Sequence, residues 1–108
     1  MNAVVTAGCA APDQAAPLPA SVDLEKETVI SGVVVAAADG LPVAGGYVRL
    51  LDATGEFTAE VVTSPAGQFR FFAAPGTWTL RVLSRSGTGD AAVTVDRGLN
   101  ELTLTVSP

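Results

Sequence analysis

The sequence predicts a small all-β protein, a seven-stranded antiparallel sandwich of two sheets. Short β-branched and aromatic runs begin at Thr28 and recur at the spacing of roughly 8 to 12 residues that is typical of sandwiches. Gly, Pro and Asp separate these runs, and no segment has the apolar period of an amphipathic helix. With 108 residues, of which 48% are apolar and 16% charged, the chain suits one folded domain with a core.

The first three strands are expected at residues 28–35, 46–52 and 57–64. The first is a run of β-branched residues, the type most enriched in strands. The second begins at the pair Gly45-Gly46, and the third follows Thr54-Gly55, so both start at residues that favour turns. The chain therefore enters each of these strands from a tight connection.

The last four strands are expected at residues 68–73, 77–84, 91–96 and 101–107. Apolar and polar residues alternate along them, which is typical of strands with one solvent-exposed face. The connections before and between them carry turn residues, namely Ser64-Pro65-Ala66-Gly67, Pro75-Gly76, Gly87-Thr88-Gly89 and Arg97-Gly98. Short connections of this kind favour antiparallel hairpins.

Alternation within the strands also predicts the core. Trp78 is the expected anchor, because a buried aromatic side chain removes about 150–250 Å² from water. The expected core comprises Val29 or Ile30, Val33, Val35, Val48, Leu50, Val61, Phe69, Phe71, Trp78, Leu80, Val82, Val93, Leu102, Leu104 and Val106.

The N-terminal part has a different composition. Residues 1–27 are predicted to be a flexible Ala/Pro-rich tail, and residues 28–108 to be the folded domain. No Lys or Arg precedes Cys9 and the apolar run before it is short, so no export signal is expected. No stretch reaches transmembrane length. We therefore expect a cytoplasmic protein without a membrane association, in which the lone thiol stays reduced.

Composition excludes several classes of function. The chain has no histidine and one cysteine, which removes imidazole catalysis, most zinc sites and an internal disulfide. We expect no enzyme activity, catalytic residue, metal or cofactor. A net charge of −5 without a Lys/Arg cluster argues against binding to nucleic acid.

Several charged residues are candidates for a surface site. Asp52, Glu56 and Glu60 follow Arg49 closely, a pattern that fits a hard-metal or acid/base site, or a solvated hairpin with ion pairs. Arginines at several strand positions could share one sheet face and bind an anion, or could pair across strands. The expected interaction surface comprises Arg49, Asp52, Glu56, Glu60, Arg70 and Arg81.

An exposed edge strand is a second route to binding. Residues 46–52 or 101–107 are the candidates for an edge that pairs with a partner or with a second copy, giving a homo-oligomer.

The sequence resembles a known domain family. The segments ISGVV, DGLPVAGGYV, GQFRF and PGTWTL are similar to the carboxypeptidase-regulatory-like domain, which implies a transthyretin-like (prealbumin-type) sandwich used as a stabilising or interaction module. Residues from Ala20 to about Val106 more narrowly resemble the small actinobacterial SseC-type proteins. That resemblance implies an association with rhodanese-type thiosulfate sulfurtransferases and a role for Cys9 as a sulfur acceptor.

Three functions remain open. The first is a non-catalytic accessory module in sulfur metabolism, with Cys9 either carrying sulfur or being an unreactive thiol near the negative Asp13. The second is an enzyme, although the hydrolases with this fold depend on histidines that the chain lacks. The third is a structural or adhesion-type module, in which Lys26 and Asn100 form a crosslink or Lys26 simply pairs with neighbouring glutamates.

Overall fold

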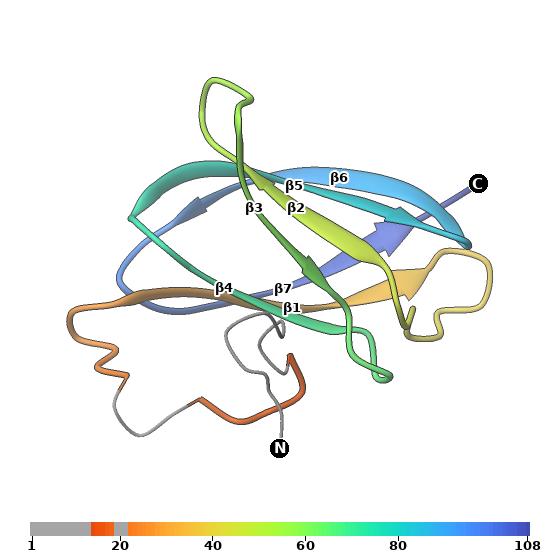
Figure 1. Cartoon of the computed structure of the whole chain (residues 1–108), viewed down its shortest axis with the longest axis horizontal. Helices are drawn as coiled ribbons and strands as arrows, with labels where there is room; N and C mark the ends of the chain where they lie inside the picture. The colour runs from red at the N-terminus through yellow and green to blue at the C-terminus, as the bar shows by residue number, and fades with distance from the viewer. Residues whose placement is uncertain (1–13, 19–21) are drawn as a thin grey trace, which may run out of the picture.

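The structure, a computed structural model, describes residues 14–18 and 22–108, which form seven strands and no helix. The strands lie in two facing sheets (Figure 1). One sheet has the order β4-β1-β7 and the other β3-β2-β5-β6. The strands are β1 (Thr28–Ala36), β2 (Tyr47–Leu51), β3 (Phe57–Val62), β4 (Gln68–Ala73), β5 (Gly76–Ser84), β6 (Gly87–Val95) and β7 (Gly98–Val106).

The predicted sandwich is confirmed, with one departure from the antiparallel arrangement. β1 and β7 pair in parallel, whereas every other pair within the sheets is antiparallel. The short connection after β6 crosses to the other sheet, where Gly98 N donates to Glu27 O and β7 begins beside the start of β1. The short connection between β6 and β7 was expected to form an antiparallel hairpin, but it joins strands of different sheets.

The start of β6 differs from the prediction for a packing reason. Gly87-Thr88-Gly89, expected as a turn, belongs to β6. A Cβ on Gly89 would overlap the carbonyl oxygen of Thr105, and a Cβ on Gly87 would overlap that of Ser107. These glycines let the backbones of β6 and β7 approach closely, and a bridge between Thr88 and Ser107 joins the two sheets along this side.

The core lies between the sheets and differs from the prediction in β1 and elsewhere. The buried residues that were not predicted are Val34, Val43, Leu51 and Val95, and the predicted residues Val61, Trp78, Val93 and Leu102 are only partly buried. Val34 is fully buried, whereas Val33 and Val35 point outward. β1 directs Ile30, Gly32 and Val34 inward, an alternation that the continuous valine run concealed. The fully buried residues of largest volume include Phe69, whose ring packs over Gly32.

Trp78 is not the core anchor that was expected. It is partly buried and packs against the buried cluster from one side. Its indole Nε1 donates a hydrogen bond of 2.8 Å to Ala74 O, in the connection between β4 and β5. An indole N–H needs such an acceptor when it leaves water.

Of the two strands proposed as sheet edges, one is confirmed and the other is wrong. β7 lies at the edge of its sheet, but β2 is an inner strand between β3 and β5. Val48 and Leu50 of β2 are buried because they face the core between the sheets.

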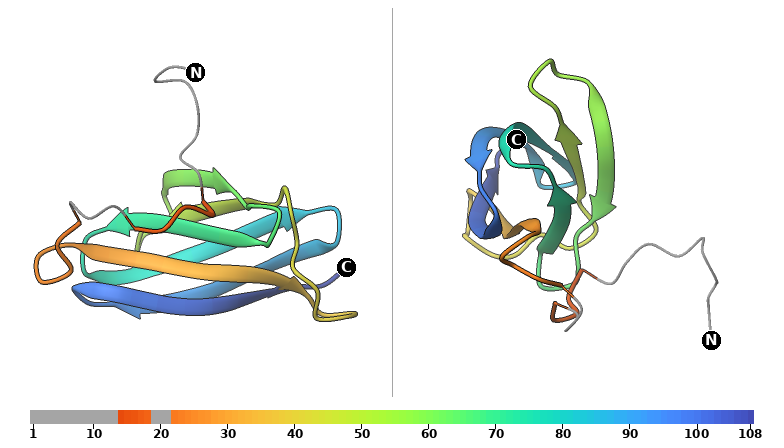
Figure 2. Two further views of the ribbon diagram at one scale, coloured as in Figure 1. Left: turned by 90° about the horizontal axis from the view of Figure 1, so that it is seen from below. Right: turned by 90° about the vertical axis from the view of Figure 1, so that its left-hand side faces the viewer.

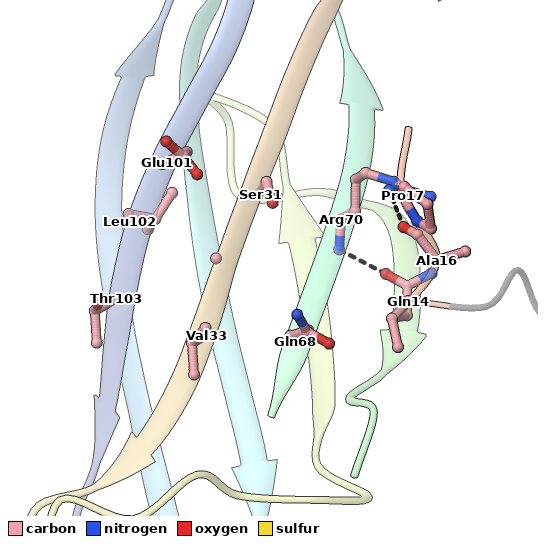
Figure 3. A pocket seen from close by; sticks show the side chains of 12 residues that line it. Gln14, Ala16, Pro17, Ser31, Val33, Gln68, Arg70, Glu101, Leu102 and Thr103 are labelled. Carbon is pink, nitrogen blue, oxygen red and sulfur yellow. Dashed lines mark hydrogen bonds between the residues drawn. The ribbon is translucent and has the colours of Figure 1, made fainter. Parts of the chain in front are cut away.

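Part of the predicted tail contacts the sandwich. The side chain of Gln14 is buried, and its Oε1 accepts a hydrogen bond of 2.5 Å from Arg70 N on β4. Arg70 Nη1 donates to Ala16 O at 2.7 Å (Figure 3). Cys9 lies outside the described residues, so the prediction of a reactive or unreactive thiol stays a prediction.

Candidate functional site

A row of charged side chains crosses the outer face of the four-stranded sheet. The registers place Glu60 of β3, Arg49 of β2, Arg81 of β5 and Asp90 of β6 side by side. Arg49 Nε donates to Glu60 Oε2 at 2.7 Å, and this is the one salt bridge among the described residues. Arg81 and Asp90 are exposed neighbours, so the face offers one neutralised pair and two accessible opposite charges.

An apolar row lies next to the charged row. Val62, Tyr47 and Leu83 face one another across β3, β2 and β5. Tyr47 is 50% exposed and Leu83 37% exposed, so large apolar side chains stand in solvent beside the arginines. Leu83 lies between two shallow hollows, one lined also by Arg81 and Asp90 and the other by Tyr47 and Arg85.

Asp52 and Glu56 lie away from this face, in the β2–β3 hairpin loop. Asp52 Oδ1 accepts hydrogen bonds from Thr54 Oγ1 at 2.6 Å, Thr54 N at 2.9 Å and Glu56 N at 3.1 Å. The Thr54 hydroxyl, followed by the backbone N–H of Glu56, holds the pKa of Asp52 below its ordinary value. The carboxylate thus shapes the turn, as aspartates in such loops commonly do.

Arg70 lies on the opposite sheet. Its register neighbours on the outer face of the three-stranded sheet are Ser31 and Glu101. These residues border a hollow of about 530 Å³ beside residues 14–17 (Figure 3). The six candidate residues therefore divide among three places: Arg49, Glu60 and Arg81 share one face, Asp52 and Glu56 form the hairpin loop, and Arg70 contacts the N-terminal segment.

The sequence analysis did not include Tyr47 and Leu83 in the expected interaction surface. Alternation along each strand did contain the signal, since Tyr47 shares a side with Arg49, and Leu83 with Arg81. Sequence alone did not show that β2 and β5 are neighbours. Within the described part of the chain, no group of three His, Cys, Asp or Glu side chains is placed to hold a metal ion.

The family of the chain follows from its sequence match. Residues 9–106 match the family described as "Protein of unknown function (DUF1416)". The chain belongs to this family. Two uncharacterized proteins of Mycobacterium tuberculosis, Rv0814c and Rv3118, are each 66% identical over 85 residues, covering 79% of this chain and 84% of the relative. An uncharacterized protein of Mycolicibacterium smegmatis is 56% identical over 91 residues, covering 83% of this chain and all of the relative.

Solved structures share the fold at low sequence identity. A DUF3823 family protein of Parabacteroides merdae has a TM-score of 0.58 at 20% identity, and the match covers 76% of this chain and 46% of that one. The 5-hydroxyisourate hydrolase of Klebsiella pneumoniae has a TM-score of 0.57 at 23% identity, covering 74% and 90%. BcpA, the major pilin subunit of Bacillus cereus, has a TM-score of 0.60 at 11% identity, covering 75% and 30%. These likenesses confirm the transthyretin-like sandwich.

The structure also bears on membrane association. No helix long and apolar enough to cross a membrane occurs in residues 14–18 and 22–108. The expected cytoplasmic location stays a prediction.

Proposed function

We propose that this DUF1416 member is a non-catalytic module that binds another protein through the outer face of its four-stranded sheet. The apolar row beside the charged row carries this proposal. Tyr and Arg are enriched among the residues that contribute most to protein interfaces, and Tyr47 and Arg81 are both accessible here. The apolar side chains supply burial, and the charges supply orientation.

The chemistry of the chain supports binding rather than catalysis. It contains no histidine, and the one carboxylate whose pKa is shifted among the described residues, Asp52, is committed to its own turn. An active site needs convergent groups for proton transfer or nucleophilic attack. The likeness to a 5-hydroxyisourate hydrolase, at 23% identity, concerns the fold alone.

For the partner, we assign a rhodanese-type thiosulfate sulfurtransferase, with Cys9 as the sulfur acceptor. The support is the resemblance of the sequence to SseC-type proteins, together with the family match, which includes Cys9 as its first residue. The Cys9 thiolate would attack the outer sulfur of a cysteine persulfide that the enzyme forms from thiosulfate with release of sulfite. The enzyme's S–S bond breaks as the new one forms at Cys9, the enzyme thiolate leaves, and the Cys9 proton goes to solvent.

Binding is tested by calorimetric titration of the full chain with the purified thiosulfate sulfurtransferase of its own organism. We expect the double variant Tyr47→Ser/Leu83→Ser to bind at least about tenfold more weakly than the wild type. Leu41→Ser/Leu99→Ser is the matched control, because both leucines are exposed but lie off this face. Equal affinity of the wild type and the Tyr47→Ser/Leu83→Ser variant would overturn the assigned face, and absence of binding by the wild type would overturn the partner.

Sulfur transfer is tested separately by intact mass. After incubation with thiosulfate and the enzyme, the wild type should gain one sulfur atom that reductant removes, and Cys9→Ser should not. A wild type that binds the enzyme and gains no sulfur would remove the acceptor role and leave the binding role in place.

A further inference from the structure

On its outer side, β3 makes no backbone hydrogen bond or bridge to another described element. On β4, the Gln14 side chain accepts a hydrogen bond from Arg70 N and so takes the place of a strand partner at that position. The start of β6 is joined to the end of β7 by the bridge between Thr88 and Ser107. β3 pairs with β2 only, and Figure 2 shows the β2–β3 hairpin projecting away from the rest of the sandwich.

The composition of β3 leaves this edge unprotected. Edge strands are normally guarded by Lys, Pro, charges or bulges. β3 has the sequence FTAEVV, without Lys or Pro, and its bulge lies at the Phe57 end. Its single charge, Glu60, is neutralised within the chain by Arg49. Phe57 and Val62, at its two ends, are 62% and 42% exposed.

The backbone bonds define which groups of β3 are available. Thr63 N donates to Gly46 O, and Thr63 O accepts from Gly45 N, so Thr63 bonds toward β2. In an antiparallel ladder the bonding side alternates along the strand. Val61 therefore bonds toward β2 as well, and the N–H and C=O groups of Glu60 and Val62 point to the free side.

We propose that a second copy of this chain occupies this edge, with the two β3 strands antiparallel about a twofold axis. Glu60 and Val62, which are separated by Val61, both have free backbone groups. The edge is therefore self-complementary, because Glu60 of each copy can donate its N–H to Val62 of the other and accept the N–H of that Val62 in return. This register centres on Val61 and keeps the two Glu60 carboxylates apart. Such an isologous contact closes at two copies, and it joins the two four-stranded sheets into one eight-stranded sheet.

The pairing also has a consequence for binding. The outer faces of the two sheets become continuous, so the dimer presents two copies of the row that contains Tyr47 and Leu83. A partner with two binding sites would then gain affinity without any new contact. The dimer itself does not depend on the proposed function, because it forms from the purified chain alone.

Sedimentation velocity on the purified full chain over a range of concentrations is the first test. We expect a monomer–dimer equilibrium that Val62→Pro shifts at least about tenfold toward monomer, because proline removes an N–H on the free side and leaves the β2 ladder intact. Val62→Thr keeps both the N–H and the β-branched shape, and should dimerise like the wild type. A wild type that is monomeric throughout, or a Val62→Pro dimer of unchanged affinity, would overturn the proposal.

Amide hydrogen exchange in the wild type provides a second measurement that needs no variant. The amides of Val61 and Ala59 should be protected at every concentration. Those of Glu60 and Val62 should slow at least about tenfold as the dimer forms. Fast exchange of Glu60 and Val62 in a sample shown to be dimeric would mean that another surface joins the copies, and would rule out the β3 edge.

Discussion

The contact between Gly32 and Phe69 supplies the most direct test of the packing. Gly32 faces the core from β1, and its φ is not in the left-handed region, so the backbone alone would accept alanine. A Cβ there would overlap the carbonyl oxygen of Leu102 and lie 2.7 Å from Phe69 Cζ. The oxygen belongs to the neighbouring strand β7 and the ring is fully buried, so neither has room to move away.

The two effects of Gly32→Ala have opposite signs. Replacing glycine in a strand reduces the entropy of the unfolded chain and stabilises by about 0.4–1 kcal/mol where the side chain fits. Overpacking a dense core costs about 1–3 kcal/mol, and a clash with backbone belongs at the upper end. We therefore expect Gly32→Ala to lower the free energy of unfolding by about 2 kcal/mol, which corresponds to a fall in Tm of roughly 8–16 °C in a domain of this size.

Urea unfolding and calorimetry measure this change. Gly46→Ala is the matched control, because a Cβ at Gly46 would make only ordinary contacts from 3.5 Å outward and its φ is likewise permissive. The control should be neutral or slightly stabilising. A Gly32→Ala variant as stable as the wild type would refute the packing of Phe69 onto the backbone of β1.

Three further predictions concern single groups. The pKa of Asp52 is lowered, so its contribution to stability is complete above its ordinary value of 3.8 and is lost as pH falls through the lower value of the folded state; the difference in urea midpoint between wild type and Asp52→Asn should shrink over that window. Trp78→Phe removes the bond to Ala74 O and should cost about 1 kcal/mol in urea unfolding, whereas an unchanged midpoint would show that the bond contributes nothing. Asn100 Nδ2 donates to backbone carbonyls, including that of Asp96 at 2.8 Å, so the intact mass should show no loss of ammonia from a crosslink with Lys26; such a loss would favour the adhesion-type function.

The sequence predicted those elements whose boundaries carry strong turn chemistry. β4 matches the prediction at both ends, because Gly67 precedes it and Pro75 follows it closely. The start of β6 was missed, because Gly87 and Gly89 suit a turn as well as they suit close packing of two backbones. Val34 was missed, because three consecutive valines give no alternation to read.

The candidate site was less predictable than the fold, because it depends on strand order. Arg49 and Glu60 are eleven residues apart, and a hairpin connects their strands, so cross-strand pairing was foreseeable. Arg81 joins them only because β5 lies next to β2, and Arg70 is excluded only because β4 belongs to the other sheet. Neither fact follows from local propensity, which says nothing about which strands become neighbours.

A buried threonine controls what the proposed binding face displays. Thr63 Oγ1 donates to Val43 O at 2.7 Å and accepts from Gly46 N at 2.8 Å, which fixes the turn that leads into β2. This places Tyr47 opposite Val62 on the outer face. A slip of one residue would turn Tyr47 toward the core and bring Val48 into solvent, because successive side chains point to opposite faces. The same slip would expose Leu50 and turn Arg49 toward the core, so the polar contacts of Thr63 and the burial of Val48 and Leu50 favour the same register, which leaves Tyr47 exposed.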